Sequence, residues 1–472
     1  MKAGLALLLV AAAIVSSSAA DQKRLLVVTV TIGFPHSSVT TAEKVIRELG
    51  EKEHLYTIDV VRSGPRPKDK EEEAKWLEKA KTELGEKMSK EGLAKYDGVI
   101  FANTTGDLPL PDPAAFIEWV KSGKAFIGTH SASDTFHGFP GYIEMIGGEF
   151  QTHGAQASVE CANQDQKHPS TASLGRSYQV RDEIYIQKNF HREKVHGLLT
   201  LDKHPNTGLP GDYPIAWCKD FGQGKVFYTA LGHREDVWDP AWTDRSGKRE
   251  NGPEVAEAYQ KHLLGGIKWA LGLEAGSGKP QRPRATLAKE DADEGFTLLF
   301  DGEDLNGWKL RNADGNKSWS VQNKMLVNLP GKDHGNDLVS EQTFKDFTIR
   351  YAYMIPKGAN SGLYLRGRYE IQILDDADSN EPKPGGNGAI YNLKPVSTFA
   401  SRPAGQWNQV EATIKGNKVS VKLNGKVVHE DVEVNAATGG ELDSNLSQPG
   451  PIMLQGDHGA VAFRNIRIKS LN

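Results

Sequence analysis

The side chains best suited to chemistry lie in two short segments, Asn360–Arg366 and Tyr369–Asp375. Both segments alternate apolar and polar residues, which predicts two β-strands that each present one polar face. That face collects amide, carboxyl, guanidinium and aromatic groups: Asn360, Gly362, Tyr364, Arg366, Glu370 and Gln372. Amide and charged groups hydrogen-bond hydroxyls, and flat rings cover the apolar face of a sugar ring. The pattern therefore predicts a carbohydrate site.

A second set of candidate groups consists of histidines near the ends of predicted strands. His36 follows the first strand, His130 lies in Gly128-Thr129-His130-Ser131, and His233 lies in Leu231-Gly232-His233. An imidazole in such a turn can act as a base or bind a metal, and it can equally be a structural hydrogen-bonding group. Glu183 can be a base, a metal ligand or the partner of an arginine. The residue types allow a divalent metal ion, and their spacing does not identify one.

Strands and helices alternate through residues 21–272, which predicts a doubly wound α/β domain with a mostly parallel sheet. The expected strands are Leu25–Thr31, Tyr56–Val61, Val99–Ala102 and Ala125–Gly128. The expected helices are Thr41–Leu49, a charged surface helix over Glu71–Lys95, and one that begins at Asp112-Pro113 and ends at Val120. Because ligands of such folds bind at the carboxyl ends of the strands, we expect His36 and His130 to converge there.

The second half of the chain has a different pattern. Residues 273–294 are charged and contain Gly and Pro, which indicates a linker to a second domain over residues 295–472. That domain is rich in short strand patterns and shows no long helical pattern. Asn424-Gly425 between two β-rich runs predicts a tight hairpin. The expected architecture is an all-β sandwich, or jelly roll.

Length and composition indicate two or three domains in a chain of 472 residues, because a single core does not grow to that size. The net charge of -4 gives no general attraction to nucleic acid or to anionic membranes. Residues 1–20 combine a lysine, an apolar run and a small-residue end, which predicts a signal peptide and a periplasmic or secreted protein. No later segment is apolar enough for a membrane span. Two cysteines, Cys161 and Cys218, leave a disulfide open.

Four motifs of the first domain resemble the ThuA-like family, which is related in fold to the class I glutamine amidotransferases. They are Gly128-Thr129-His130-Ser131, Gly147-Gly148-Glu149-Phe150-Gln151-Thr152-His153, Asp182-Glu183-Ile184-Tyr185 and Leu231-Gly232-His233. The resemblance implies a flavodoxin-like sheet and a link to trehalose or other keto-sugar use. Amidotransferase activity is not expected, because His130 stands where those enzymes need a cysteine.

The second domain resembles the 3-keto-disaccharide hydrolase family, whose fold is like that of concanavalin A. Its motifs occur in order and include Asn360-Ser361-Gly362, Tyr369-Glu370-Ile371-Gln372-Ile373-Leu374-Asp375, Gly388-Ala389-Ile390-Tyr391 and Leu454-Gln455-Gly456-Asp457-His458-Gly459. The resemblance implies cleavage of 3-keto-glycosides. A ketone at C3 acidifies the hydrogen on C2, so a base removes it, the group on C1 leaves by elimination, and water adds afterwards.

The resemblance also implies a set of site residues. Glu370 and His458 are the candidates for base and acid, in either order, and Arg366, Gln372 or a metal ion would polarise the ketone. Asp375 would orient Arg366 or hold a metal. In the first domain His130 and His233 are the expected catalytic residues. The expected substrate-binding residues are Asn360, Gln372, Asp375, Tyr391, Gln455 and Glu183.

Two functions remain open at this point. The main hypothesis is an exported hydrolase that cleaves 3-keto-disaccharides and carries a ThuA-like domain for keto-sugar processing. The rival is a lectin-like carbohydrate-binding module joined to a ThuA-like scaffold without catalysis. They differ in whether Glu370, His458 and Arg366 converge on one pocket. No nicotinamide fingerprint follows a strand, so a separate sugar 3-dehydrogenase would supply the oxidised glycoside.

Overall fold

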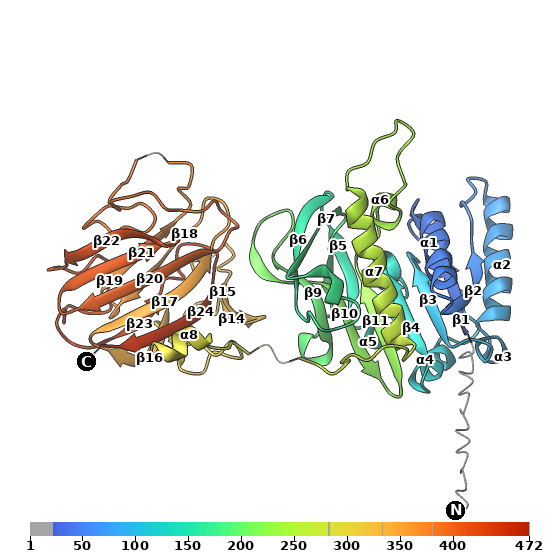
Figure 1. Cartoon of the computed structure of the whole chain (residues 1–472), viewed down its shortest axis with the longest axis horizontal. Coiled ribbons are helices and arrows are strands. Elements are labelled where there is room, and N and C mark those ends of the chain that lie inside the picture. The colour runs from blue at the N-terminus through green and yellow to red at the C-terminus, as the bar shows by residue number, and fades with distance from the viewer. Residues whose placement is uncertain (1–21, 282–283, 333, 380, 472) are drawn as a thin grey trace, which may run out of the picture.

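The computed structural model describes residues 22–281, 284–332, 334–379 and 381–471. These residues form an α/β domain followed by an all-β domain (Figure 1). The predicted signal peptide, residues 1–20, lies outside the described residues. Among the helices of the described ranges, none is both long enough and apolar enough to cross a bilayer.

The first domain is built on a nine-stranded sheet in the order β2-β1-β3-β4-β11-β10-β9-β6-β7. Its strands, in chain order, are β1 (Lys23–Thr29), β2 (Tyr56–Arg62), β3 (Gly98–Ala102), β4 (Ala125–Thr129), β6 (Ala157–Asn163), β7 (Ser177–Asp182), β9 (His196–Lys203), β10 (Pro210–Phe221) and β11 (Gly224–Thr229). A separate pair consists of β5 (Glu149–His153) and β8 (Tyr185–Lys188).

Only half of the large sheet is parallel. Strands β2, β1, β3, β4 and β11 pair in parallel, whereas β11, β10, β9, β6 and β7 pair antiparallel. The prediction of a mostly parallel sheet is therefore wrong for its second half. The physical reason is connectivity: β9, β10 and β11 follow one another without an intervening helix, and short connections join antiparallel neighbours.

Helices cover both faces of the sheet, as the doubly wound pattern predicts. One core contains α1 (Val39–Lys52) and α7 (Pro253–Ala270), and the other contains α2 (Lys70–Lys87), α4 (Pro113–Lys121) and α5 (Pro140–Ile146). Two short helices, α3 (Lys90–Leu93) and α6 (Glu235–Trp238), complete the domain, with 3₁₀ turns at His130–Asp134, Ala172–Leu174 and Arg192–Lys194.

The charged segment expected as one surface helix is divided into α2 and α3. The break falls at Ser89, whose Oγ accepts the backbone N–H of Gly92 and so begins a new helix. The helix expected from Asp112 is confirmed as α4. Its first turn is capped by the Asp112 carboxylate, which accepts the Ala115 N–H at 2.8 Å.

The two cysteines are free and buried. Cys161 lies in β6 and Cys218 in β10, and β9 runs between these two strands. Strands two places apart are separated by about 10 Å, whereas a disulfide needs Cα atoms within about 7 Å. The disulfide that the sequence left open is therefore not formed.

The second domain is a sandwich of two antiparallel sheets, which confirms the predicted architecture. The larger sheet has the order β14-β15-β24-β17-β20-β21-β22, with β12 beside β24. Its members are β12 (Thr297–Leu298), β14 (Trp319–Gln322), β15 (Met325–Asn328), β17 (Phe347–Met354), β20 (Asn408–Lys415), β21 (Lys418–Leu423), β22 (Lys426–Glu433) and β24 (Val461–Ser470). The predicted Asn424-Gly425 hairpin joins β21 to β22.

The smaller sheet has the order β13-β16-β23-β18-β19. Its members are β13 (Trp308–Leu310), β16 (Leu338–Phe344), β23 (Gly450–Leu454), β18 (Asn360–Leu365) and β19 (Tyr369–Leu374). One face of the β18–β19 hairpin packs into the core between the sheets through Leu363, Leu365, Ile371 and Ile373. The other face is therefore turned away from that core, as the alternation predicts.

The expected linker, residues 273–294, packs against both domains. The carbonyl oxygen of Gly276 accepts the Trp269 indole N–H, and that of Lys279 lies 2.9 Å from His196 Nδ1. Further on, the short helix α8 (Lys289–Asp293) lies on the second domain, where the Asp291 carboxylate pairs with Arg350 and Arg467.

Candidate functional site

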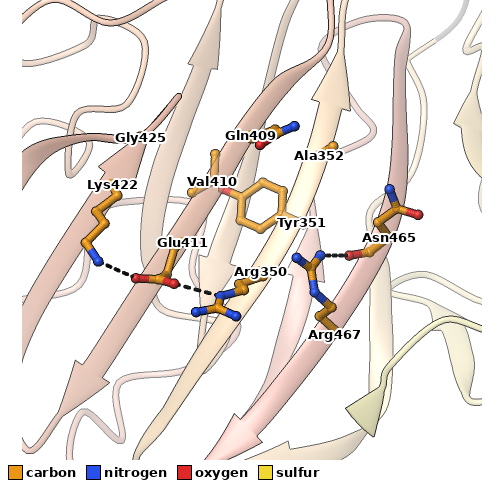
Figure 2. A pocket seen from close by; sticks show the side chains of 10 residues that line it. All are labelled: Arg350, Tyr351, Ala352, Gln409, Val410, Glu411, Lys422, Gly425, Asn465 and Arg467. Atoms are coloured by element: carbon orange, nitrogen blue, oxygen red, sulfur yellow. Dashed lines mark hydrogen bonds and ion pairs between the residues drawn. The ribbon is translucent and has the colours of Figure 1, made fainter. Parts of the chain in front are cut away.

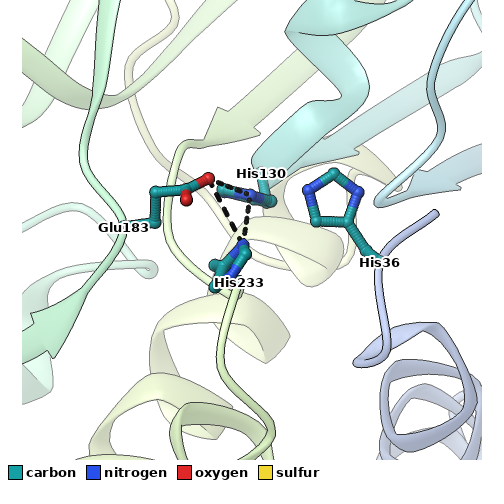
Figure 3. Close-up of side chains that lie close together, drawn as sticks. All are labelled: His36, His130, Glu183 and His233. Atoms are coloured by element: carbon teal, nitrogen blue, oxygen red, sulfur yellow. Dashed lines mark hydrogen bonds and ion pairs between the residues drawn. The ribbon is translucent and has the colours of Figure 1, made fainter. Parts of the chain in front are cut away.

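Loops from four neighbouring parallel strands meet at one edge of the first domain. His36 follows β1, Asn103 follows β3, His130 follows β4 and His233 follows β11. The rings of His36 and His130 lie 4.9 Å apart between centroids, so the convergence expected at the strand ends is present. Glu183 joins them from the end of β7, at the far edge of the sheet (Figure 3).

We call His36, His130, Glu183 and His233 the histidine cluster. Each offers one donor atom, and these four atoms lie within 4.8 Å of one another. His130 Nε2 is 3.3 Å from His233 Nδ1 and 3.6 Å from Glu183 Oε2. Glu183 Oε2 is also 3.3 Å from His233 Nδ1. Imidazole nitrogens and a carboxylate oxygen suit zinc and other first-row divalent ions, so these residues can hold a metal.

The orientation of His130 is fixed by the backbone. Its Nδ1 lies 2.9 Å from the carbonyl oxygen of Ala230, and a carbonyl only accepts, so Nδ1 donates and carries the proton. In the neutral ring Nε2 then presents a lone pair to the cluster. His130 is fully buried and has a positive φ of 43°, a conformation that a side chain other than glycine rarely adopts. Such strain is often found at functional sites.

Asn103 ties together the loops that carry the three histidines. Its Nδ2 donates to Ser38 Oγ and to the Gly232 carbonyl, both at 2.8 Å, and its Oδ1 accepts from Thr129 Oγ1 at 2.8 Å. Ser38 is two residues from His36, while Thr129 and Gly232 directly precede His130 and His233. One buried amide therefore holds all three loops in register.

Asp182 ties the segment that carries Glu183 to the loop that carries His233. Its carboxylate accepts the backbone N–H of Gly232 at 2.7 Å and of Arg234 at 3.2 Å, on either side of His233. Since Glu183 is its chain neighbour, this contact fixes the distance between Glu183 and His233. Complete burial raises the pKa of Asp182 to about 7, against the opposing effect of these N–H donors.

Burial also determines the protonation of the cluster. It lowers the pKa of His130 well below its ordinary value, and it lowers the pKa of His36 to about 3, with further lowering from the neighbouring imidazoles. Burial raises the pKa of Glu183. Neutral imidazoles are the form that binds metal, so the histidines are ready as ligands at neutral pH.

One side of the histidine cluster is accessible to solvent. His153, at the end of β5, is 43% exposed in its side chain, and its Nδ1 lies 3.2 Å from Glu183 Oε1. The Tyr185 ring closes another side, with its centroid 4.3 Å from that of His130. A ligand would therefore enter past His153.

The second candidate site lies on the outward face of the β18–β19 hairpin. Tyr364 Oη donates to Glu370 Oε2 at 2.9 Å, and Gln455 Nε2 donates to Tyr364 Oη at 3.4 Å. We call Asn360, Tyr364, Glu370 and Gln455 the sheet-face site. Residues 364 and 370 are direct cross-strand partners, which explains why their side chains meet.

Glu370 is covered on both sides. A Cβ added to Gly362 would lie 2.1 Å from Glu370 Oε1, so the carboxylate occupies the space that a side chain would fill. The loop after β22 covers the other side: Thr438 Oγ1 accepts the Glu370 N–H, and Gly440 packs against Tyr364 Oη. Glu370 is consequently only 2% exposed.

Burial raises the pKa of Glu370 to about 7, while the Tyr364 hydroxyl and His458 oppose this rise. Asp457 and Asp337 add to it by like-charge repulsion. His458 is half exposed and its Nδ1 is paired with the Asp457 carboxylate. A carboxyl group with a pKa near neutrality is suited to take up and release a proton.

Two buried acceptors of the sheet-face site have no hydrogen-bond partner among the described residues. They are Asn360 Oδ1 and Gln455 Oε1. Gln455 is held next to this strand because its N–H donates to the Gly362 carbonyl at 2.9 Å. Unpaired buried acceptors are rare in folded proteins, and hydroxyl groups of a bound sugar would satisfy them.

Arg366 does not join the sheet-face site, and the prediction that it polarises the substrate ketone is corrected. Its guanidinium binds Asp346 at 2.9 Å and the Lys345 carbonyl, and its side chain is 2% exposed. The reason is that strand β18 ends at Leu365, so Arg366 enters a turn with a φ of 55° and leaves the predicted face.

Asp375 is likewise placed outside the site. It follows the last residue of β19, and its carboxylate accepts the Gly358 N–H at 2.8 Å, so it neither orients Arg366 nor faces Glu370. Gln372 lies on the correct face and is buried, with Nε2 3.3 Å from the Gly385 carbonyl. Tyr391 donates its backbone N–H to the Glu370 carbonyl and so lies beside the same strand.

The structure places at the two sites several residues to which the sequence assigns no role. The sequence puts His36 after a strand and Tyr364 on the polar face of the first strand pattern, and it gives neither a role in catalysis or binding. His153 and Asn103 have a similar signal, because each lies at or directly after the end of a strand. Asp337, whose charge contributes to the raised pKa of Glu370, directly precedes β16 and carries no sequence signal.

A hollow of about 300 Å³ lies elsewhere, on the outer face of the larger sheet (Figure 2). Its charged groups are already paired, since Glu411 binds Arg350 at 2.7 Å and Lys422 at 2.8 Å. None of its lining residues belongs to the sheet-face site. We assign it no function.

Comparison with known families gives the same two domains. The model of the ThuA family, described as trehalose utilisation, matches residues 24–270, which is more than half of the chain. The chain belongs to the ThuA family. Residues 295–469 match the model of the 3-keto-α-glucoside-1,2-lyase-like domain. The predicted fusion of a ThuA domain to a 3-keto-disaccharide hydrolase domain is therefore confirmed.

The individual relatives described next share less than a quarter of their aligned residues with this chain. A 3-keto-disaccharide hydrolase from Bacteroides thetaiotaomicron is 24% identical over 312 residues, covering 55% of this chain and 98% of that protein. A proposed glycosyl hydrolase from Parabacteroides distasonis is 24% identical over 40% of this chain and 100% of its own, with a TM-score of 0.35. A proposed ThuA-like protein from Parabacteroides merdae is 18% identical over 55% and 94%, with a TM-score of 0.41. The family matches and the first relative support a hydrolase.

Proposed function

We propose that the protein is an exported enzyme that cleaves 3-keto-glycosides in its second domain, by elimination across C1 and C2. The observation that carries this proposal is the environment of Glu370. It is a buried carboxyl group with a pKa raised to about 7, and it accepts a hydrogen bond from Tyr364. Two buried acceptors of the same site, Asn360 Oδ1 and Gln455 Oε1, have no partner among the residues that the structure describes. Such a carboxyl group is a suitable base for the weakly acidic hydrogen next to a ketone.

The mechanism uses three residues of the sheet-face site together with His458, which lies outside it. Glu370 takes the proton from C2, and the electron pair left behind forms the C1–C2 double bond as the C1 oxygen leaves. His458, paired with Asp457, donates a proton to that leaving oxygen. Asn360 and Gln455 accept hydrogen bonds from sugar hydroxyls through their free oxygens. A separate sugar 3-dehydrogenase would supply the oxidised glycoside, and the predicted signal peptide would place the reaction in the periplasm or outside the cell.

The test is an assay with a 3-keto-glucoside that carries a chromogenic leaving group, beside the same glucoside without the ketone. We expect cleavage of the keto form alone. Glu370→Gln should lower kcat/KM by about 10²-fold to 10⁴-fold, the range for loss of a general base. Glu411→Gln is the matched control, because Glu411 is a partly buried carboxylate on the outer face of the same domain. Equal cleavage by the Glu370→Gln protein would overturn the proposal.

The lectin-like alternative shares one observation with the enzyme, because the free oxygens of Asn360 and Gln455 would serve binding as well as catalysis. It predicts a different result in the same assay. Both glucosides would then bind, measured by calorimetry, and neither would be cleaved.

A further inference from the structure

The histidine cluster lies in the first domain, and the elimination proposed for the second domain makes no use of it. Its four donor atoms converge within 4.8 Å, and three of its members are buried or nearly so. We propose that His36, His130, His233 and Glu183 form a divalent transition-metal centre, and that this centre hydrates the unsaturated keto sugar released by the second domain. The substrate in this inference rests on the proposed function; the metal centre does not.

The arrangement of lone pairs favours a cation over a network of hydrogen bonds. His130 Nε2 is an acceptor because Nδ1 donates to Ala230, and Glu183 Oε2 is an acceptor as a carboxylate. His233 Nδ1 faces both at 3.3 Å and can supply one proton at most. A metal ion is a partner that all of these lone pairs can share. Three nitrogens and one oxygen favour zinc, manganese, cobalt or iron over calcium and magnesium.

The surrounding contacts are those that metal sites require. The ligand His130 donates its other ring N–H to a backbone carbonyl, which fixes its orientation. Asn103 and Asp182 hold the loops of the remaining ligands from outside the cluster. The ligands therefore keep their geometry without the ion, so that binding need not pay for ordering the loops.

The accessible side of the cluster suits a sugar. The Phe34 side chain is 66% exposed, and its ring lies 5.2 Å from that of His36, where it offers a flat apolar surface. His153 and Glu183, which lie 3.2 Å apart, offer hydrogen-bonding groups beside the cluster. A 2-hydroxy-3-keto sugar has two neighbouring oxygens, at C2 and C3, and both can reach one cation.

The elimination product needs a further step before it is a free sugar. It has a C1–C2 double bond conjugated with the C3 carbonyl, so C1 is electrophilic. The oxygen of a water molecule bonds to C1 while His153 takes one of its protons. The C1–C2 π electrons shift toward C2 and C3 and leave a negative charge on the C3 oxygen, and a cation held by the histidine cluster would stabilise that charge. The proton then returns to C2, so that one water is added in total.

The metal part is tested by metal analysis of the full-length mature protein after incubation with Zn²⁺ or Mn²⁺ alone and removal of excess ion. We expect about one ion per chain, and loss of it in His233→Ala and in Glu183→Gln, whose side chains are partly accessible and less critical for folding. His191→Ala is the control, since His191 is an exposed histidine outside the cluster. No stoichiometric ion in the wild type, or full retention in both cluster variants with native circular dichroism, would overturn the metal centre.

The hydration part is tested by supplying the unsaturated keto sugar directly and following it by proton NMR in D₂O. We expect addition of water with deuterium at C2 by the wild type and by His191→Ala. Chelator-treated protein and Glu183→Gln should lose at least about 10²-fold of the rate. Metal binding without hydration would overturn the assigned reaction alone. Hydration with metal dependence, but without cleavage of 3-keto-glycosides, would overturn the proposed function of the second domain and leave this inference in place.

Discussion

The histidine cluster of the first domain draws its four side chains from loops spread between residues 36 and 233, whereas the sheet-face site takes three of its four from a single hairpin. The first is held by outer residues such as Asn103, and the second by direct packing of neighbouring strands. Substitutions should therefore disable the two sites in different ways. The geometry of a site on separate loops depends on the hydrogen bonds that hold those loops together. The geometry of a site on adjacent strands depends on the packing around each side chain.

The largest effect on activity among these predictions is expected from filling the space under Glu370. In Gly362→Ala the new Cβ would lie 2.1 Å from Glu370 Oε1, so the carboxylate must move. We expect kcat/KM on the keto-glucoside to fall by about 10²-fold, since a shift of about 1 Å has that cost. The metal content should not change.

Gly85→Ala is the matched control for this substitution. Gly85 lies in α2, where an added Cβ meets nothing within 4 Å. Because alanine favours helix, it should stabilise the protein by roughly 0.5–1 kcal/mol and leave kcat/KM unchanged. Wild-type activity in Gly362→Ala would mean that packing does not position Glu370.

The next effect concerns the pH dependence of stability and the protonation of Glu370. The folded protein keeps the Glu370 proton up to a pKa of about 7, against an ordinary value of 4.5. The unfolded chain therefore releases this proton first, and stability is lost as pH rises through this range. The loss should reach about 3 kcal/mol at pH 8 relative to pH 4.

Glu370→Gln cannot titrate, so it should lack this part of the pH dependence. The measurement is chemical denaturation of both proteins from pH 4 to pH 8, in which groups common to both cancel in the difference. A difference that stays constant with pH would show that Glu370 titrates near its ordinary value in the folded protein.

The third effect concerns metal affinity and the side chain of Asn103. Asn103→Ala removes the amide that joins the loops of His36, His130 and His233. We expect metal affinity to fall by about 10-fold to 100-fold, as for outer contacts in other metal sites. Cleavage of keto-glycosides by the second domain should be unaffected. Isothermal titration with Zn²⁺ measures the first effect, and Asn435→Ala, an exposed asparagine of the second domain, is the control.

The smallest effect on activity is expected at Arg366. Its guanidinium binds Asp346 and a backbone carbonyl rather than the site, so Arg366→Lys should lower stability by roughly 1–2 kcal/mol through loss of fork-shaped bonding. The kcat/KM should change by less than about twofold, because a buried side chain that does not contact the substrate leaves the barrier intact. A selective loss of kcat would contradict this prediction and show that Arg366 contributes to the sheet-face site.

Much of the fold could be predicted from the sequence because it rests on local patterns. The alternating segments Asn360–Arg366 and Tyr369–Asp375 predicted β18 and β19 to within one residue at the end of each strand, and Asp112-Pro113 predicted the start of α4. The antiparallel half of the first sheet could not be predicted in this way. Its strands have no helical crossovers between them, and the choice of partner depends on which edge of the sheet is free.

The features of the two sites also divide into those set by local sequence and those set by tertiary structure. Local sequence determined that Glu370 and Tyr364 lie opposite one another, because strand periodicity and a short hairpin place them there. Only the tertiary structure decided that Arg366 turns away, since one residue past the strand end changes direction. It also decided that Glu183 reaches His130 across the sheet, since residues from separate loops become neighbours only when the whole domain packs. The burial of Glu370, and therefore its raised pKa, also results from tertiary packing.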